Sequence, residues 1–201
     1  NNPNFFIKNS DVLDKINFPV NTVKSNDKDN IITFKDWIIE NLKNTQKNII
    51  DNARYNFFTQ KRIHNSVIEI LKKQNKTEFF NFLINELPNH FDLEIINIVT
   101  SNSDVSKKYN LQLKKKELLE KIYGVENQLI LDAVDHELQI FEESKKIYSN
   151  AIFSLSNKIF NSPSLLIFGS KDKHFIDNKA YELILFFSNV VQEKLNQFSN
   201  D

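Results

Sequence analysis

The sequence predicts an α+β fold, in which an antiparallel sheet with helices on one face follows a long helix and a short helical segment. Three observations support this prediction. Residues 32–73 contain no proline or glycine and repeat apolar side chains at helical spacing. Short apolar and β-branched runs cluster between residues 93 and 170, without the alternation of strand and helix that a parallel sheet requires. A strongly amphipathic segment at 177–198 closes the chain.

Residues 1–30 are expected to form a helical segment and a linker. Ser10 and Asp11 can cap a short helix, which Pro19 ends. Residues 21–30 are almost entirely polar, which is typical of a flexible linker.

The segment 31–75 is predicted to be a dimerisation helix, opened by Thr33 and Asp36. Its apolar side chains recur at the a and d positions of a heptad repeat, which is the pattern of a coiled coil with polar interruptions. The a positions are Ile39, Gln46, Ala53, Gln60 and Val67, and the d positions are Leu42, Ile49, Asn56, Ile63 and Ile70.

We expect the first half of this helix to pair with a second copy of the chain and the second half to pack on its own domain. The expected dimer seam contains Leu42, Ile49, Ala53, Asn56 and Ile63. The alternative is an amphipathic helix that lies on its own domain throughout.

Residues 76–201 are predicted to form the domain that contains the sheet. Helices are expected at 77–91, ended by Pro88, and at 111–124, ended by Gly124, with a polar loop at 101–110. Strands are expected at 93–100, 127–134, 137–141, 150–156 and 164–170. The final helix is expected to use Asp177 as its N-cap.

Gly169, one of only two glycines in the chain, ends the last predicted strand. We expect it to adopt backbone angles closed to other residues, so that the strand can leave the sheet sharply. Asp172 is expected to accept hydrogen bonds from backbone amides in the following turn. Phe175 is expected to fold back into the core below the final helix.

Several segments resemble, in the same order, the GAF-like family known as domain of unknown function 484. NPNFF stands where that family has His-Pro-Asp-Phe-Phe, with Asn2 in place of the usual histidine. DNARYN (51–56) is similar to its Ala-Arg-x-Asn signature, IYSNAIFSL (147–155) to its Ser-x-Ala strand, and LLIFGSKDKHF (165–175) to its Gly-Ser-x-Asp-x-x-Phe ending. The resemblance covers nearly the whole chain and implies a cytoplasmic bacterial protein with a GAF-like sheet, without supplying a ligand or a reaction.

Composition and charge restrict the classes of function. The 26 basic and 26 acidic residues cancel, whereas a protein that binds nucleic acid directly usually carries a basic excess. The lysines at 114–116 precede Glu117 and Glu120, as on a solvated helix face. The chain has no cysteine, which excludes disulfides and thiolate metal sites and suits the cytoplasm. No apolar run approaches the roughly 18 residues of a membrane span, so no membrane association is expected.

The densest polar cluster contains Asp132, Asp135, His136 and Glu137. Carboxylates and imidazole bind divalent metals, but adjacent ligands rarely converge on one ion, so a solvated hairpin is the favoured interpretation. The four histidines have no neighbouring nucleophile or triad pattern. We therefore expect no catalytic residues, no metal and no cofactor. Trp37 is expected either to anchor a partner or to pack against Phe5, Phe6 and Phe34.

A ligand pocket is conceivable between one sheet face and a covering segment at 101–127. Its expected lining is Tyr109, Tyr123, Ile152, Ser154 and Phe168. The favoured alternative is that these side chains fill the core, because apolar strand faces usually pack.

Three functions follow as hypotheses. The first is a non-enzymatic GAF-like sensory or protein-interaction module, a homodimer that responds to an unidentified small molecule or protein partner. The second is a structural adaptor with a filled core and no ligand. The third, least favoured, is an enzyme acting on a small molecule, which would need a convergent polar cluster.

Overall fold

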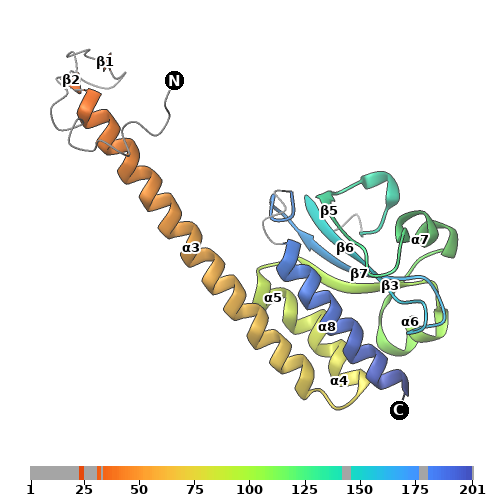
Figure 1. Cartoon of the computed structure of the whole chain (residues 1–201). Coiled ribbons are helices and arrows are strands. Elements are labelled where there is room, and N and C mark those ends of the chain that lie inside the picture. Colours follow the sequence, from red (N-terminus) through yellow and green to blue (C-terminus); the bar gives the residue numbers. More distant parts are fainter. Residues whose placement is uncertain (1–22, 25–30, 33, 142–145, 177–180, 201) are drawn as a thin grey trace. The chain divides into compact units, whose positions relative to one another are not determined.

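The computed structural model describes residues 23–24, 31–32, 34–141, 146–176 and 181–200 (Figure 1). The chain divides into two compact units, residues 1–56 and 57–201. The short helix predicted between Ser10 and Pro19 lies outside the described residues, as do Thr33 and the expected N-cap Asp177.

In the first unit, two very short strands precede the long helix. β1 (Val23–Lys24) and β2 (Ile31–Ile32) pair antiparallel, where the sequence predicts a linker and the start of the helix. Helix α3 (Phe34–Lys72) begins in this unit and continues into the second. The prediction of a long helix is confirmed, and its physical basis is the absence of any residue that interrupts helical hydrogen bonding.

The second unit contains a five-stranded sheet in the order β4-β3-β7-β6-β5. Its strands are β3 (Ile95–Thr100), β4 (Gln112–Leu113), β5 (Leu129–Ala133), β6 (Ser149–Leu155) and β7 (Ser164–Ser170). Every neighbouring pair is antiparallel except β3 and β4, which are parallel. The predicted α+β class with a largely antiparallel sheet is therefore confirmed.

Helices cover both faces of this sheet, not one face as expected. Helices α4 (Lys76–Asn81), α5 (Leu87–Phe91) and α8 (Tyr181–Asn200) lie with the end of α3 on one side (Figure 1). Helix α7 (Lys116–Tyr123) packs on the other side, through Leu119 and Ile122. Because both faces are covered, β6 and β7 are buried at every position, including the polar residues Ser149, Asn150 and Ser154 of β6.

Alternation along the strands divides the core into two clusters. Phe153 and Phe168 point to the side of α8, where they join Phe187 and Ile70. Ile152 and Ile167 point to the side of α7, where Phe141 and Ile147 complete the packing. The second half of α3 belongs to the first cluster, as predicted.

Several local predictions are wrong, three of them between residues 101 and 141. The segment 137–141 is not a strand, because the Asp135 side chain accepts the Glu137 amide at 2.9 Å and opens a 3-10 turn at His136–Leu138. The loop at 101–110 contains helix α6 (Ser103–Tyr109), capped by the Asn102 side chain. The helix predicted at 111–124 begins later, since β4 occupies its first residues.

The helix predicted to stop at Pro88 continues past it. Between α4 and α5 the chain forms a π-helical turn, Phe82–Glu86, and Pro88 lies in the first turn of α5. A proline is tolerated there because the first amides of a helix need no partner within it. The helix ends instead at Asp92, which adopts a left-handed conformation with φ of 55°.

Gly169 is required for a different reason from the one predicted. It lies within β7 and has no positive φ, so it does not release the strand; Gly124, at φ of 52°, ends α7 as expected. The two other expectations for this turn are confirmed. Asp172 accepts the His174 amide at 2.9 Å, and Phe175 is buried in the core.

Candidate functional site

The first half of α3 carries a row of exposed apolar side chains. Ile39 is 39 % exposed, Leu42 64 %, Ile49 63 % and Ile50 44 %. Residues three, four and seven positions apart lie on one side of a helix, so these side chains form a single row. Contiguous exposed apolar side chains are typical of surfaces that contact a protein, a membrane or a ligand.

Four of the five residues expected in the dimer seam belong to this surface, and one does not. Leu42, Ile49, Ala53 and Asn56 are all exposed. Ile63 is only 5 % exposed and packs in the core of the second unit, so it cannot take part in a seam. A straight helix turns once in 3.6 residues and drifts away from a strict heptad, and by Ile63 the d position has turned toward the domain.

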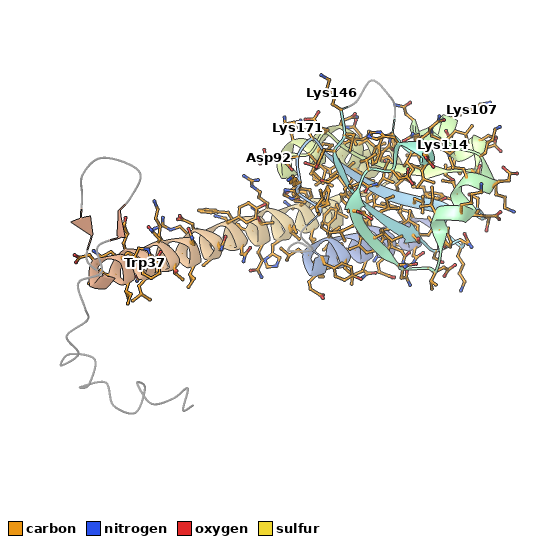
Figure 2. The ribbon with its side chains drawn as sticks, turned by 90° about the horizontal axis from the view of Figure 1, so that it is seen from above. Trp37, Asp92, Lys107, Lys114, Lys146 and Lys171 are labelled. Carbon is orange, nitrogen blue, oxygen red and sulfur yellow. The ribbon has the colours of Figure 1, made fainter. Side chains whose placement is uncertain are left out.

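Trp37 lies near the start of α3 and is half exposed (Figure 2). Phe5 and Phe6, against which it was expected to pack, lie outside the described residues.

The five side chains expected to line a ligand pocket do not surround one space. Tyr109 and Phe168 belong to the cluster on the α8 side of the sheet. Tyr123 and Ile152 belong to the cluster on the α7 side, and Ser154 follows Ile152 at the two-residue spacing that keeps it on that side. The sheet itself separates the two groups, so these five side chains do not line a single pocket, and the favoured alternative, in which they fill the core, agrees with their packing.

The polar atoms of these residues are used inside the fold. The Ser154 hydroxyl donates to the Tyr123 carbonyl at 2.6 Å, and the Tyr123 hydroxyl donates to the Leu155 carbonyl. Burial raises the pKa of Tyr123 to about 12, with a smaller contribution from the Glu126 carboxylate. These contacts clamp the end of α7 onto β6 and leave Tyr123 without a free polar group.

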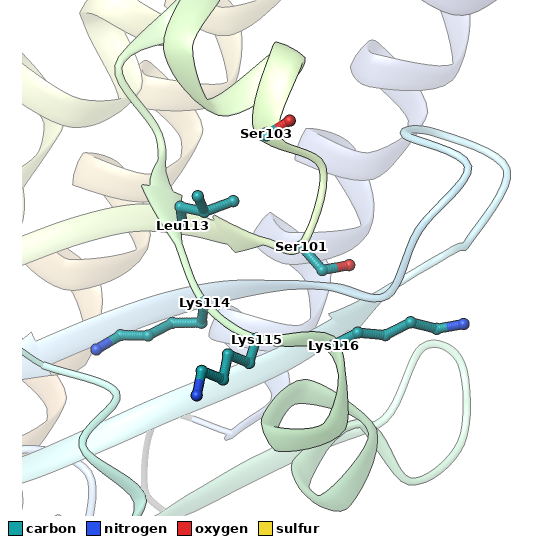
Figure 3. Close-up of a pocket in the computed structure, with 6 residues that line it drawn as sticks. All are labelled: Ser101, Ser103, Leu113, Lys114, Lys115 and Lys116. Atoms are coloured by element: carbon teal, nitrogen blue, oxygen red, sulfur yellow. The ribbon is translucent and has the colours of Figure 1, made fainter.

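A shallow cavity of about 350 Å³ lies at the β3–β4 edge of the sheet (Figure 3). It is lined by Ser101, Ser103, Leu113, Lys114, Lys115 and Lys116. The ammonium groups of Lys114 and Lys115 extend to one side, and that of Lys116 to the other (Figure 3). Lys116 also lies 3.6 Å from Glu120, so the three cations do not converge on one point.

Compared with known families, residues 1–200 match the one described as "Protein of unknown function, DUF484". The chain belongs to the DUF484 family. A search of curated proteins finds no match.

Of the four DUF484 segments noted in the sequence, NPNFF lies outside the described residues and the other three fall on different elements. DNARYN lies on α3 and contributes Ala53 and Asn56 to the exposed surface. IYSNAIFSL contains β6, and LLIFGSKDKHF contains most of β7 and the turn after it. The strands of the last two segments are buried, whereas Tyr148 and the turn residues Lys171, Asp172 and Lys173 are exposed.

The polar cluster expected at a hairpin is solvent-exposed and local. Asp132 lies in β5, Asp135 caps the 3-10 turn, and His136 and Glu137 lie in that turn. Within the described ranges, no three histidine or carboxylate side chains come close enough to hold a metal ion together. Of the helices that the structure describes, none combines the length and apolar character of a membrane span.

Seven exposed apolar residues of α3 lie outside the a and d pattern: Trp37, Ile50, Tyr55, Phe57, Phe58, Ile68 and Leu71. A heptad pattern selects one side of a helix, so it leaves out exposed side chains on the other sides.

Proposed function

We propose that this DUF484 chain is a GAF-like, non-enzymatic interaction module of the cytoplasm that forms a homodimer through α3. The exposed row of Ile39, Leu42, Ile49 and Ile50 is the observation that supports the proposal. Helices with such rows pair with other helices, because the apolar side chains leave water only when a second helix covers them.

The free energy gained by burying these side chains is large enough to stabilise a dimer. Fully burying a leucine or isoleucine side chain stabilises by about 1.5–3 kcal/mol. A symmetric pair brings four such side chains from each copy, which can offset an association cost of about 4–15 kcal/mol. Gln46 and Asn56 on the same surface lower the stability of the pair and restrict its register.

Within this proposal, a protein partner is favoured over a small-molecule ligand. The side chains expected to line a ligand pocket are divided between two packed clusters, which favours the alternative of an adaptor with a filled core. Native mass spectrometry of the purified protein tests this point. A small molecule that co-purifies in stoichiometric amount would contradict the filled-core alternative and support a sensory role.

Light scattering coupled to size-exclusion chromatography tests the homodimer. The unmodified chain is expected to elute with twice the mass of one copy at micromolar concentration, and the Leu42→Lys/Ile49→Lys variant with the mass of one. The matched control, Asn44→Lys/Asn48→Lys, adds the same charge on the other side of the helix and is expected to remain dimeric. A monomeric unmodified chain, or equal behaviour of the two variants, contradicts the proposal.

A further inference from the structure

Positive charge is concentrated around the cavity at the β3–β4 edge of the sheet (Figure 3). Residues 101–121 contain six lysines and three carboxylates, whereas the whole chain has as many acidic as basic residues. The cavity is lined by Lys114, Lys115, Lys116, Ser101, Ser103 and Leu113. Its lining therefore carries three ammonium groups and no carboxylate, in a chain without net charge.

The cavity lies beyond the carboxyl ends of two parallel strands. β3, α6 and β4 form a unit in which a helix connects a parallel pair. Ser101 follows the last residue of β3, and Lys114 follows the last residue of β4. In open sheets built from such units, ligands bind in a crevice outside the carboxyl ends of the strands. The position of the cavity therefore favours a binding site.

Buried contacts hold the main chain around the cavity in place. The Lys114 amide donates to the Thr100 carbonyl at 3.1 Å and extends the β3–β4 ladder beyond β4. The buried Thr100 hydroxyl accepts from the Ser164 hydroxyl at 2.9 Å and from the Asn102 amide at 3.2 Å. Because the main chain is fixed on both sides, a ligand has to order only the lysine side chains when it binds.

The lysines of the cavity are available to a ligand. Within the described residues, Lys114 and Lys115 form no ion pair. Lys116 lies 3.6 Å from Glu120, but both side chains of this pair are more than half exposed, at 63 % and 53 %. Exposed pairs contribute little stability, so Lys116 can exchange Glu120 for a carboxylate of another molecule.

The neighbouring charges lie on the two helices beside the cavity. Asp104 lies on α6 and accepts the Ser103 hydroxyl at 3.4 Å, while Glu117 and Glu120 lie on α7. The other lysines of this region are Lys107, Lys108 and Lys121, on the same two helices. Because the carboxylates repel a long polyanion such as nucleic acid, the surroundings favour a short acidic ligand confined to the cavity.

The directions of the lysines determine the shape of ligand that fits. The ammonium groups of Lys114 and Lys115 extend to one side of the cavity and that of Lys116 to the other (Figure 3). A compact anion such as phosphate therefore cannot contact all three. An extended ligand with carboxylates at both ends can, and Leu113, which is 48 % exposed, offers contact to an apolar side chain.

We propose that the cavity binds a short acidic segment of a partner protein in an extended conformation. Carboxylates at one end of the segment pair with Lys114 and Lys115, and a carboxylate at the other end pairs with Lys116. An apolar side chain of the segment contacts Leu113. The site lies entirely in the second unit, so it is separate from the homodimer proposed through the first half of α3. Complementary charge gives the cavity specificity for such a partner.

Fluorescence anisotropy with the labelled peptide Glu-Glu-Leu-Glu-Glu tests the proposal on the full chain. Saturable binding is expected, and added salt should weaken it because exposed charges are screened. Lys114→Gln/Lys115→Gln is expected to weaken binding by about fivefold or more, and Lys116→Gln by about twofold or more. The matched control, Lys107→Gln/Lys108→Gln, removes two adjacent lysines of α6 that do not line the cavity and should change binding by less than about twofold.

The contact with Leu113 has a separate test. Leu113→Ser is expected to weaken binding of the leucine peptide by about twofold or more, and to leave binding of Glu-Glu-Gly-Glu-Glu unchanged. An equal effect on both peptides would overturn the apolar contact. Circular dichroism of every variant is expected to match that of the unmodified chain, because the replaced side chains are exposed or half-buried.

Four results would overturn the site. The first two are the absence of saturable peptide binding by the unmodified chain, and equal losses in the two double variants, which indicate a general attraction to lysines. The third is tighter binding of a labelled oligothymidine of five nucleotides, which indicates a nucleic acid. The fourth is displacement of the peptide by an equal concentration of pyrophosphate, which indicates a compact anion. A chain that is monomeric by light scattering yet shows the expected peptide binding contradicts the homodimer and supports this site.

Discussion

Gly169 of β7 lies directly opposite Ile95 of β3, and a Cβ atom at position 169 would lie 2.7 Å from the Ile95 Cγ2 methyl. Ile147 and Phe141 close the same space at 3.1 Å. The three side chains belong to the cluster beneath α7. They pack into the space that a side chain at position 169 would occupy.

We therefore expect Gly169→Ala to lower the free energy of unfolding by about 1–3 kcal/mol through overpacking. Removing the closest methyl in the Gly169→Ala/Ile95→Ala variant should give a loss smaller than the sum of the two single losses. Urea denaturation of the three variants measures this coupling. Simple additivity would show that the glycine does not serve the packing of Ile95.

Tyr123 is predicted to make stability depend on pH above about 10. Its ordinary pKa is about 10, and burial followed by the Glu126 carboxylate raises the pKa of the folded state to about 12. A group whose pKa is raised on folding contributes stability that is fully present below the unfolded pKa and is lost as the pH rises through the folded one. The unfolding free energy should therefore fall between pH 10 and 12, and this part of the fall should be absent in Tyr123→Phe.

The same variant also removes the hydrogen bond to the Leu155 carbonyl, which should cost about 1 kcal/mol at pH 7. Tyr148→Phe is the matched control, since that side chain is half exposed. Parallel pH profiles for Tyr123→Phe and the unmodified chain would contradict the expected titration.

Two buried serines are predicted to be stabilised by losing their hydroxyls. Ser66 on α3 and Ser188 on α8 have buried hydroxyl oxygens without a hydrogen-bond partner among the described residues. Because an unsatisfied buried polar group costs about 1–3 kcal/mol, Ser188→Ala should raise the unfolding free energy by about 1 kcal/mol. Ser106→Ala is the contrasting variant, since the buried Ser106 hydroxyl donates to the Leu111 carbonyl at 2.8 Å, and it should lower stability by a similar amount. Thermal denaturation should shift in opposite directions for the two; a shift in the same direction would refute the argument.

Gln192 is predicted to hold the loops around β5 and β6 to α8. Its side-chain oxygen accepts the Ser156 amide at 2.8 Å, and its nitrogen donates to the Asn127 side chain at 2.7 Å. Gln192→Ala should lower the unfolding free energy by about 2 kcal/mol, because two hydrogen bonds are lost and the Ser156 amide is left without its partner. Gln197→Ala, at an exposed position of the same helix, should change it by less than about 0.5 kcal/mol. Hydrogen exchange at Ser156 should accelerate only in the first variant.

The elements that the sequence predicted well are those with strong local patterns. The uninterrupted run behind α3, the 3.6-residue spacing of α8 and the short apolar runs of β3, β6 and β7 each carry their own periodicity. The wrong predictions concern segments whose conformation depends on contacts with side chains elsewhere in the chain. The apolar residues at 140 and 141 resemble part of a strand, yet they pack under the sheet without pairing.

In the candidate site, too, some features could be predicted from local patterns and others depend on distant contacts. The sequence alone predicted that α3 carries exposed apolar residues. It could not predict which side of α3 a second copy can reach, because that depends on the side that packs against the domain. Ile63 was assigned to the seam because the heptad pattern contains no information about the core that buries it. Similarly, Ile152 and Phe168 were grouped in one pocket, although the strand register places Phe168 opposite Ala151 on the other face.

The sequence by itself determined the long helix α3, the final helix α8 and the strands β3, β6 and β7. Helical and strand periodicities, glycine and proline act within a few residues, so they can be recognised locally. Only the tertiary structure decided which face of the sheet each side chain enters, why Gly169 must lack a side chain, and which side of α3 stays exposed. Those outcomes depend on the pairing and packing of residues far apart in the chain, where a shift of one residue in register exchanges the two faces.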